Sequence, residues 1–283
     1  MKKFTTLLTV LALLVAGLNA QTPVKIFMIG DSTMANKPLE NDNQERGWGQ
    51  MLGECFSAAD VTIDNHAVNG RSTLSFITDG RWDKVLSQIK PGDYVFIQFG
   101  HNDEKPDEKR HTEPGSTFDA NLRKFCVEAR EKGGIPVLYN SIVRRSFFVN
   151  ENAVTEDDNF GKGITLKTEG NKLVETHVIT REDGSKADYL ASPRNVAAEL
   201  GVPFIDANKI THDFVESFGP ELSKKFFCWI PAGTNLAAPN GREDNTHLNI
   251  LGARVVAALL ANATCEEVPA LKPYLRYINL TEK

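Results

Sequence analysis

Short apolar runs alternate with amphipathic stretches along most of the chain. Runs with the length and composition of buried strands occur at 24–30, 61–68, 93–100, 135–143 and 202–206. Apolar positions at helical spacing follow or separate them, at 47–59, 81–89, 117–134 and 249–263. Strands separated by helices favour an α/β protein whose parallel sheet is covered by helices on both faces.

Residues 144–186 interrupt this alternation. The segment is polar and rich in turn residues, and "ITLKTE" and "THVIT" within it alternate apolar and polar positions. That pattern predicts a surface insertion that is β-hairpin-like. Because the chain contains no repeat, low-complexity tract or linker, we expect one domain over 21–283 that includes this insertion.

The first 20 residues have the layout of a secretory signal peptide. Lys2 and Lys3 precede an apolar stretch, and the small residue Ala20 marks a cleavage point. A membrane anchor is the alternative, but the uncharged stretch is short for a span. We therefore expect a secreted or periplasmic protein with no membrane span in its mature form.

Composition and charge narrow the classes of partner. The 283 residues are 41% hydrophobic and carry a formal net charge of −5, with no basic stripe, so nucleic acid is not an expected partner. Export would permit disulfides, and four cysteines allow three pairings. The two that lie in helical patterns are equally compatible with buried thiols. The cysteines are Cys55, Cys126, Cys228 and Cys265.

Four polar clusters lie where a site would form in such a fold. "GDS" (30–32), "NGRS" (69–72) and "GHND" (100–103) each follow a predicted strand, and "DNTH" (244–247) precedes the last predicted helix. Ligands of parallel α/β sheets bind beyond the carboxyl ends of the strands. The order of elements therefore allows the four clusters to converge.

Ser32 has two interpretations. It is either the N-cap of a following helix or a nucleophile, and the cap is the commoner role of such a serine taken alone. A nucleophilic serine needs a base, for which His247 is the candidate. Asp244, three residues earlier in a turn entering the last helix, would orient the imidazole. Asp244 as a helix cap is the alternative.

Gly70 and Asn102 complete the requirements of acyl transfer. A glycine allows a backbone N–H to approach a developing oxyanion, and an asparagine amide supplies a side-chain donor. Together with the N–H of Ser32, they would form an oxyanion hole. Taken singly, "NG" is also a common turn and "HND" a plausible loop start.

In this order, the clusters resemble the sequence blocks of the SGNH hydrolase (GDSL-type esterase) superfamily. "GDSTMA", "RGWGQ", "NGRSTLSF", "FGHND" and "DNTHLN" look most like its rhamnogalacturonan acetylesterase branch. The resemblance implies a three-layer α/β/α sandwich with a flavodoxin-like parallel five-stranded sheet. It also implies a catalytic triad of Ser32, Asp244 and His247. The implied oxyanion hole consists of Ser32, Gly70 and Asn102.

The function that we expect is a serine esterase that removes O-acetyl groups from acetylated rhamnogalacturonan through an acetyl-serine intermediate. Thr33, where many lipolytic members have leucine, is usual in this branch. We expect a monomer, with no metal or cofactor. Arg71 and His101 are the candidate cations for an acidic pectin. The alternatives are acetylxylan or another acetylated carbohydrate, a lipolytic esterase for longer acyl chains, and a catalytically silent carbohydrate-binding protein.

Overall fold

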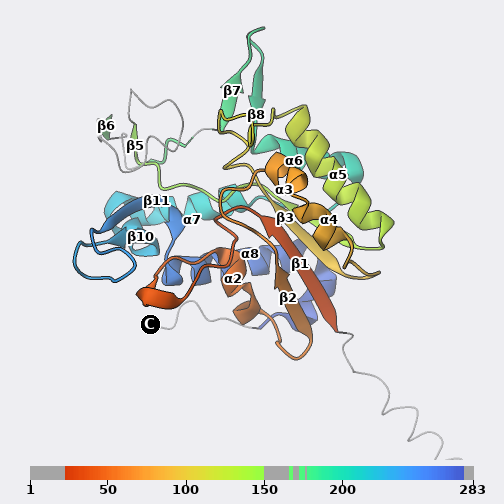
Figure 1. Ribbon diagram of the computed structural model, residues 1–283, viewed down its shortest axis with the longest axis horizontal. Coiled ribbons are helices and arrows are strands. Elements are labelled where there is room, and N and C mark those ends of the chain that lie inside the picture. Colours follow the sequence, from red (N-terminus) through yellow and green to blue (C-terminus); the bar gives the residue numbers. More distant parts are fainter. Residues whose placement is uncertain (1–22, 150–165, 168–171, 176, 277–283) are drawn as a thin grey trace, which may run out of the picture.

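A single parallel sheet forms the centre of the molecule (Figure 1). The computed structural model describes residues 23–149, 166–167, 172–175 and 177–276. The strand order is β2-β1-β3-β4-β9, and all neighbours in the sheet are parallel. This is the order of flavodoxin-like folds, so the predicted sheet is confirmed. Its strands are β1 (Val24–Gly30), β2 (Val61–Asn65), β3 (Tyr94–Gln98), β4 (Ile135–Tyr139) and β9 (Phe204–Ile205).

Helices cover both faces of this sheet (Figure 1). One face packs against α3 (Thr73–Thr78), α4 (Arg81–Leu86), α5 (Thr117–Glu131) and α6 (Ala191–Leu200). The other packs against α2 (Trp48–Met51), α7 (Ala207–Leu222) and α8 (Ile250–Glu267). The short 3-10 helices are η1 (Glu40–Asp42), η2 (Leu52–Cys55), η5 (Ser223–Phe226) and η6 (Pro269–Tyr274).

The side chains of β1 explain why the structure has three layers. Successive strand residues point to opposite faces of a sheet. Ile26 and Met28 belong to the core beneath α2 and α8, whereas Phe27 and Ile29 belong to the core beneath α4 and α5. All four side chains are fully buried. A strand buried on both faces reads as a continuous apolar run, which is the pattern that predicted it.

Among the described residues, three antiparallel strand pairs lie outside the central sheet. β10 (Phe227–Ile230) pairs with β11 (Arg242–Leu248), and β7 (Val178–Thr180) pairs with β8 (Lys186–Asp188) in the hairpin expected within 144–186. β6 (Leu166–Lys167), inside "ITLKTE", pairs with β5 (Phe148–Val149) rather than with "THVIT". The insertion thus contains a hairpin, but its two alternating stretches are in different strand pairs.

The first residues of the predicted surface insertion are buried, so the surface prediction is wrong for them. Arg144 and Arg145 are 1% and 0% exposed. Buried polar groups need partners, and Arg145 has them: its Nε and Nη1 donate to Ser223 Oγ (2.9 Å) and Asn245 Oδ1 (2.5 Å). Polar composition alone indicated a surface, because it does not reveal partners distant in sequence.

The cysteines and two of the tryptophans belong to the core. All four cysteines are buried free thiols, so none of the possible disulfides is formed. Burial raises the pKa of Cys126 to about 12, which leaves that thiol protonated at neutral pH. Trp48 and Trp82 are fully buried, and their indole N–H groups donate to other side chains.

Within the described part of the chain, no helix combines the length and the apolar character that crossing a membrane requires. The expected signal peptide, residues 1–20, lies outside the described residues.

Candidate active site

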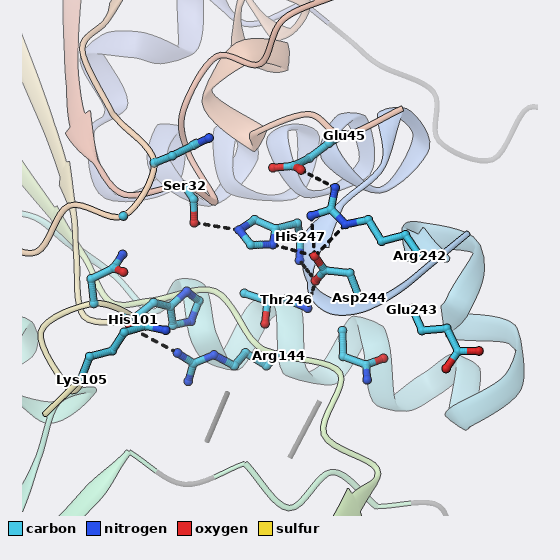
Figure 2. A pocket seen from close by; sticks show the side chains of 14 residues that line it. Ser32, Glu45, His101, Lys105, Arg144, Arg242, Glu243, Asp244, Thr246 and His247 are labelled. Atoms are coloured by element: carbon cyan, nitrogen blue, oxygen red, sulfur yellow. Dashed lines mark hydrogen bonds and ion pairs between the residues drawn. The ribbon is translucent and has the colours of Figure 1, made fainter. Parts of the chain in front are cut away.

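The four polar clusters meet at the carboxyl edge of the sheet and line one cavity of about 540 Å³ (Figure 2). Ser32 follows β1, Gly70 lies in the loop after β2, and Asn102 follows β3. After β1 the chain continues to β2 on one side of the sheet, and after β3 it continues to β4 on the other side. α/β sheets bind ligands at the carboxyl ends of two such neighbouring strands, whose connections run in opposite directions. Asp244 and His247 reach the same cavity from β11.

Three side chains form a continuous series of hydrogen bonds. The Oγ of Ser32 lies 2.9 Å from Nε2 of His247, whose Nδ1 lies 2.8 Å from Oδ2 of Asp244 (Figure 2). Because an ionised carboxylate only accepts hydrogen bonds, Nδ1 carries the hydrogen of the neutral imidazole. Nε2 is then unprotonated and faces the hydroxyl of Ser32, which is the arrangement of a general base beside a nucleophile.

Ser32 does not cap a helix in this structure. Residues 32–35 form a turn, in which the N–H groups of Met34 and Ala35 both donate to the carbonyl of Asp31. The cap-like role belongs to Asp31, whose carboxylate accepts from the N–H and the hydroxyl of Thr33 (2.9 and 2.7 Å). The hydroxyl of Ser32 is therefore available to His247.

The expected turn before the last helix is an irregular part of a strand. Glu243 and Leu248 of β11 pair with Trp229 and Phe227 of β10, so four residues on β11 face a single residue on β10. Such a bulge bends a strand and redirects its side chains. The bulged residues here are 244–247, and they include Asp244 and His247, the two residues predicted to form a triad with Ser32. The carboxylate of Asp244 also accepts from the backbone N–H of His247 (2.8 Å), which fixes the local turn.

A partly buried network of charges holds Asp244 ionised. Burial alone would raise the pKa of Asp244, but its hydrogen bond from His247 and the charge of Arg242 lower it below its usual range. Nη2 of Arg242 lies 2.5 Å from Asp244 Oδ2, and its Nη1 lies 2.6 Å from Oε2 of Glu45. Nζ of Lys37 pairs in turn with Oε1 of Glu45 (2.6 Å). Asp244 can therefore keep its charge while His247 gains a proton.

Three hydrogen-bond donors border the cavity beside Ser32. Gly70 has a φ of +73°, a left-handed conformation that favours glycine, and a Cβ placed there would meet open space. In the part of the chain that the structure describes, the N–H groups of Ser32 and Gly70 have no hydrogen-bond partner. Nδ2 of Asn102 makes one long hydrogen bond, to the carbonyl of Arg71 (3.3 Å). These three groups can donate hydrogen bonds to an oxyanion.

The two residues predicted to bind an acidic substrate do not supply the expected positive charge. Arg71 pairs with Asp79 (2.7 Å) and is not among the residues lining the cavity. His101 lines it but is buried, and burial together with the charge of Arg144 lowers its pKa well below the usual value. A neutral imidazole cannot neutralise a substrate carboxylate.

Other cations line the cavity instead: Lys105, Arg144 and Arg242. Sequence reasoning missed them, although two have a recognisable position. Lys105 lies four residues after His101, in the loop that follows β3, and Arg144 follows β4 at the same edge of the sheet. The polar composition of the segment from residue 144 predicts a surface insertion, and that prediction conceals the position of Arg144 at the carboxyl end of β4.

The fold is that of a known class of hydrolases. The chain belongs to the GDSL-like lipase/acylhydrolase family, whose model matches residues 28–255. It is 38% identical over 253 residues to rhamnogalacturonan acetylesterase RhgT of Bacillus subtilis, covering 89% of this chain and 94% of that protein. It is 29% identical over 271 residues to rhamnogalacturonan acetylesterase of Emericella nidulans, covering 92% and 91%. The crystal structure of Bacillus subtilis YxiM is similar, with a TM-score of 0.62, 25% identity and coverage of 89% and 57%.

Proposed function

We propose that this protein is a carboxylic ester hydrolase that removes O-acetyl groups from carbohydrate through an acetyl-enzyme formed on Ser32. The observation that carries the proposal is the hydrogen-bonded series from Ser32 through His247 to Asp244 at the wall of the cavity. Membership of the GDSL-like family and the two relatives named as rhamnogalacturonan acetylesterases support carbohydrate acetylesterase activity.

In the first half of the reaction, Oγ of Ser32 attacks the acetyl carbonyl while Nε2 of His247 takes the hydroxyl proton. The carbonyl oxygen becomes negatively charged and accepts hydrogen bonds from the N–H groups of Ser32 and Gly70 and from Nδ2 of Asn102. When the C–O bond to the sugar breaks, His247 gives its proton to the departing oxygen. The products of this half are a free sugar hydroxyl and acetyl-Ser32.

In the second half, a water molecule replaces the sugar. Nε2 of His247 takes a proton from that water, whose oxygen attacks the carbonyl of acetyl-Ser32, and the same three donors stabilise the oxyanion. The proton then returns to Oγ of Ser32 as acetate leaves. Asp244 remains ionised throughout and stabilises the imidazolium that forms twice in each cycle.

The lining of the cavity favours a short acyl group. Among the described residues, the side chains that line it are polar, charged or glycine, and none is an aliphatic or aromatic hydrocarbon. A longer acyl chain gains affinity by burying methylene groups against hydrocarbon side chains, at about 0.8 kcal/mol each, and no such side chain lines this cavity among the described residues. We therefore expect the 4-nitrophenyl ester of acetate to be hydrolysed at least about 100-fold more efficiently than the octanoate ester. Equal efficiency would favour the lipolytic alternative.

The first candidate substrate is acetylated rhamnogalacturonan, and acetylxylan is the second. Rhamnogalacturonan carries carboxylates, and Lys105 lies at one side of the cavity (Figure 2). Lys105→Gln should lower kcat/KM on acetylated pectin fragments roughly tenfold and leave acetylated xylan fragments nearly unaffected. Lys109→Gln, in the same loop, is the matched control. A strong preference for acetylated mannan or chitin would contradict the pectin assignment without affecting the esterase chemistry.

The chemistry itself is tested by acetate release from acetylated oligosaccharides. Ser32→Ala and His247→Ala should each lower kcat by at least about 10³-fold, whereas Ser87→Ala and His212→Ala should leave it within twofold. If both site variants release acetate at the rate of the unchanged protein, the mechanism is wrong. A carbohydrate-binding protein without activity would also fail this test, because its unchanged form would release none.

Export and oligomeric state are further parts of the proposal. We propose that residues 1–20 act as a signal peptide in a secreted or periplasmic protein, and that the mature protein is a monomer. Expression of the full chain with its own N-terminus, followed by N-terminal sequencing of the exported product, should give a protein beginning at Gln21. Recovery of the product with Met1 or only in membranes would contradict the export proposal. Light scattering during size-exclusion chromatography measures the molar mass in solution, which should be that of a single chain.

A further inference from the structure

Behind one wall of the cavity lies a buried cluster of ionisable side chains that the proposed esterase chemistry does not use. His101 and Glu104 come from the loop after β3, and Glu175 and His177 come from the segment before β7. The two imidazole rings are nearly parallel, with their centroids 6.0 Å apart. Both histidines are at least 96% buried. This cluster connects the loop that carries Asn102 to Glu175 and His177, which lie between β6 and β7.

The ring nitrogens of the two histidines are arranged as in metal-binding histidines. Nε2 of His101 lies 3.0 Å from the carbonyl of Ile142, and Nδ1 of His177 lies 2.8 Å from Oε2 of Glu104. Metal-ligating imidazoles typically donate one ring N–H to a carbonyl or carboxylate in this way, while the other nitrogen faces the metal. Since a carbonyl only accepts, Nδ1 of His101 carries a lone pair.

The opposite ring nitrogens converge on a third ligand. Nδ1 of His101 is buried and has no hydrogen-bond partner among the described residues, and Nε2 of His177 has only its ion pair with Oε1 of Glu175 (2.8 Å). Together with a carboxylate oxygen of Glu175, these atoms all lie within 4.8 Å of one another. A buried polar atom without a partner is rare, and an ion bound between these three atoms would supply the partner that Nδ1 of His101 lacks.

Charge also favours a cation at this position. The carboxylates of Asp31, Glu104 and Glu175 surround the cluster, whereas Arg144 supplies one positive charge beside Glu104. A divalent cation at this position would balance all three carboxylates together with Arg144.

We propose that His101, Glu175 and His177 bind one divalent transition-metal ion, with zinc as the best match. Two imidazoles and one carboxylate suit zinc, whereas calcium and magnesium prefer oxygen ligands alone. Tetrahedral bonds of about 2.0–2.1 Å to zinc place ligand atoms roughly 3.3 Å apart, so atoms 4.8 Å apart would move about 1.5 Å closer together. The ion would fix Glu175 and His177 to the loop of Asn102, so its role is structural. It takes no part in the steps at Ser32, and its test is independent of them.

Metal content and zinc affinity test this proposal directly. The protein is stripped with a chelator, dialysed and titrated with zinc at pH 6 and pH 8. We expect one zinc per chain, with tighter binding at pH 8 because protons compete with zinc for the ligand atoms. His177→Gln and Glu175→Gln should each weaken binding by about 100-fold. His212→Gln, a partly exposed histidine outside the cluster, is the control and should bind as the unchanged protein does.

Thermal unfolding gives a second measurement that does not depend on activity. Zinc should raise the Tm of the unchanged protein and of His212→Gln, but not that of His177→Gln or Glu175→Gln. If His177→Gln fails to fold, Glu175→Gln alone decides, because it is close to isosteric. The proposal is overturned if the stripped protein takes up no stoichiometric zinc at pH 8. It is equally overturned if the two ligand variants bind zinc as tightly as the control.

Discussion

Replacing Asp244 with asparagine tests whether the charge of this residue, rather than its shape, supports His247. The two side chains have the same size, so the cavity keeps its form. Oδ2 of Asp244 accepts from His247 Nδ1 (2.8 Å) and Oδ1 accepts from the N–H of Thr246 and of His247 (both 2.8 Å). Arg242 donates to Oδ2 as well. An amide nitrogen at either position would face donors, so at least one of these groups loses its acceptor.

The magnitude follows from the charge that forms on His247 in the transition state. Side-chain exposure of 16% for Asp244 and 26% for His247 justifies an effective dielectric constant of about 20. With roughly 4 Å between the centres of charge, the imidazolium and the carboxylate attract each other by about 4 kcal/mol. Loss of that attraction slows the chemical step by about 10³-fold. Binding of the neutral ground state changes little, so we expect the effect in kcat rather than in KM.

Steady-state kinetics with acetylated oligosaccharides and with 4-nitrophenyl acetate measure this effect. Asp79→Asn is the matched control, because it removes a carboxylate that pairs with Arg71 away from the cavity. That control should keep kcat within twofold. A loss of less than about tenfold in Asp244→Asn, with folding intact by thermal unfolding, would refute the role assigned to Asp244.

Three further predictions concern stability and the oxyanion hole. Burial would raise the pKa of Glu104, but the charges of Arg144 and His177 outweigh it and lower this pKa to about 2. The contribution of Glu104 to stability is therefore present above pH 4.5 and is lost as the pH falls toward 2. In chelator-treated protein, Glu104→Gln should flatten the fall of Tm over this pH range. Gly70→Ala should lower kcat roughly tenfold and the free energy of unfolding by about 1 kcal/mol, since its φ of +73° strains any side chain although space is available; unchanged values in both assays would contradict this. Gly252→Ala should lower the free energy of unfolding, measured by chemical denaturation, by about 3 kcal/mol, because its Cβ would clash with the backbone carbonyl of Phe226. Gly53→Ala is the control: its Cβ would have its nearest contact at 3.9 Å, so it should cost under about 1 kcal/mol.

Local patterns predicted the central sheet because its signal is contained in short windows of sequence. Residues 24–30 form a strand over the predicted range, while the runs at 61–68 and 93–100 end three and two residues early, at Asn65 and Gln98. The missing residues at these carboxyl ends belong to the site loops, where polar side chains and turns replace the ladder. The closing helix extends beyond its predicted end, to Glu267, because its apolar face continues along the core.

The site residues were predictable for a related reason, and their supporting contacts were not. Gly70 and Asn102 follow strands whose order in a parallel sheet places their ends together. The partners of Asp244 come from remote positions: Arg242 pairs with Glu45, nearly 200 residues earlier in the chain, and no local pattern marks that contact. His101 is predicted to bind substrate as a cation, but its neutral state depends on burial and on neighbours that only the folded chain brings together.

Mass spectrometry of the enzyme during turnover tests the central claim most directly. The protein is mixed with excess 4-nitrophenyl acetate, quenched in acid within the first turnovers and digested. The mechanism predicts one acetyl group per chain on the peptide that contains Ser32, and none on that peptide in Ser32→Ala. An unmodified Ser32 peptide during active acetate release, or acetyl transfer that persists at the same rate in Ser32→Ala, would contradict the account.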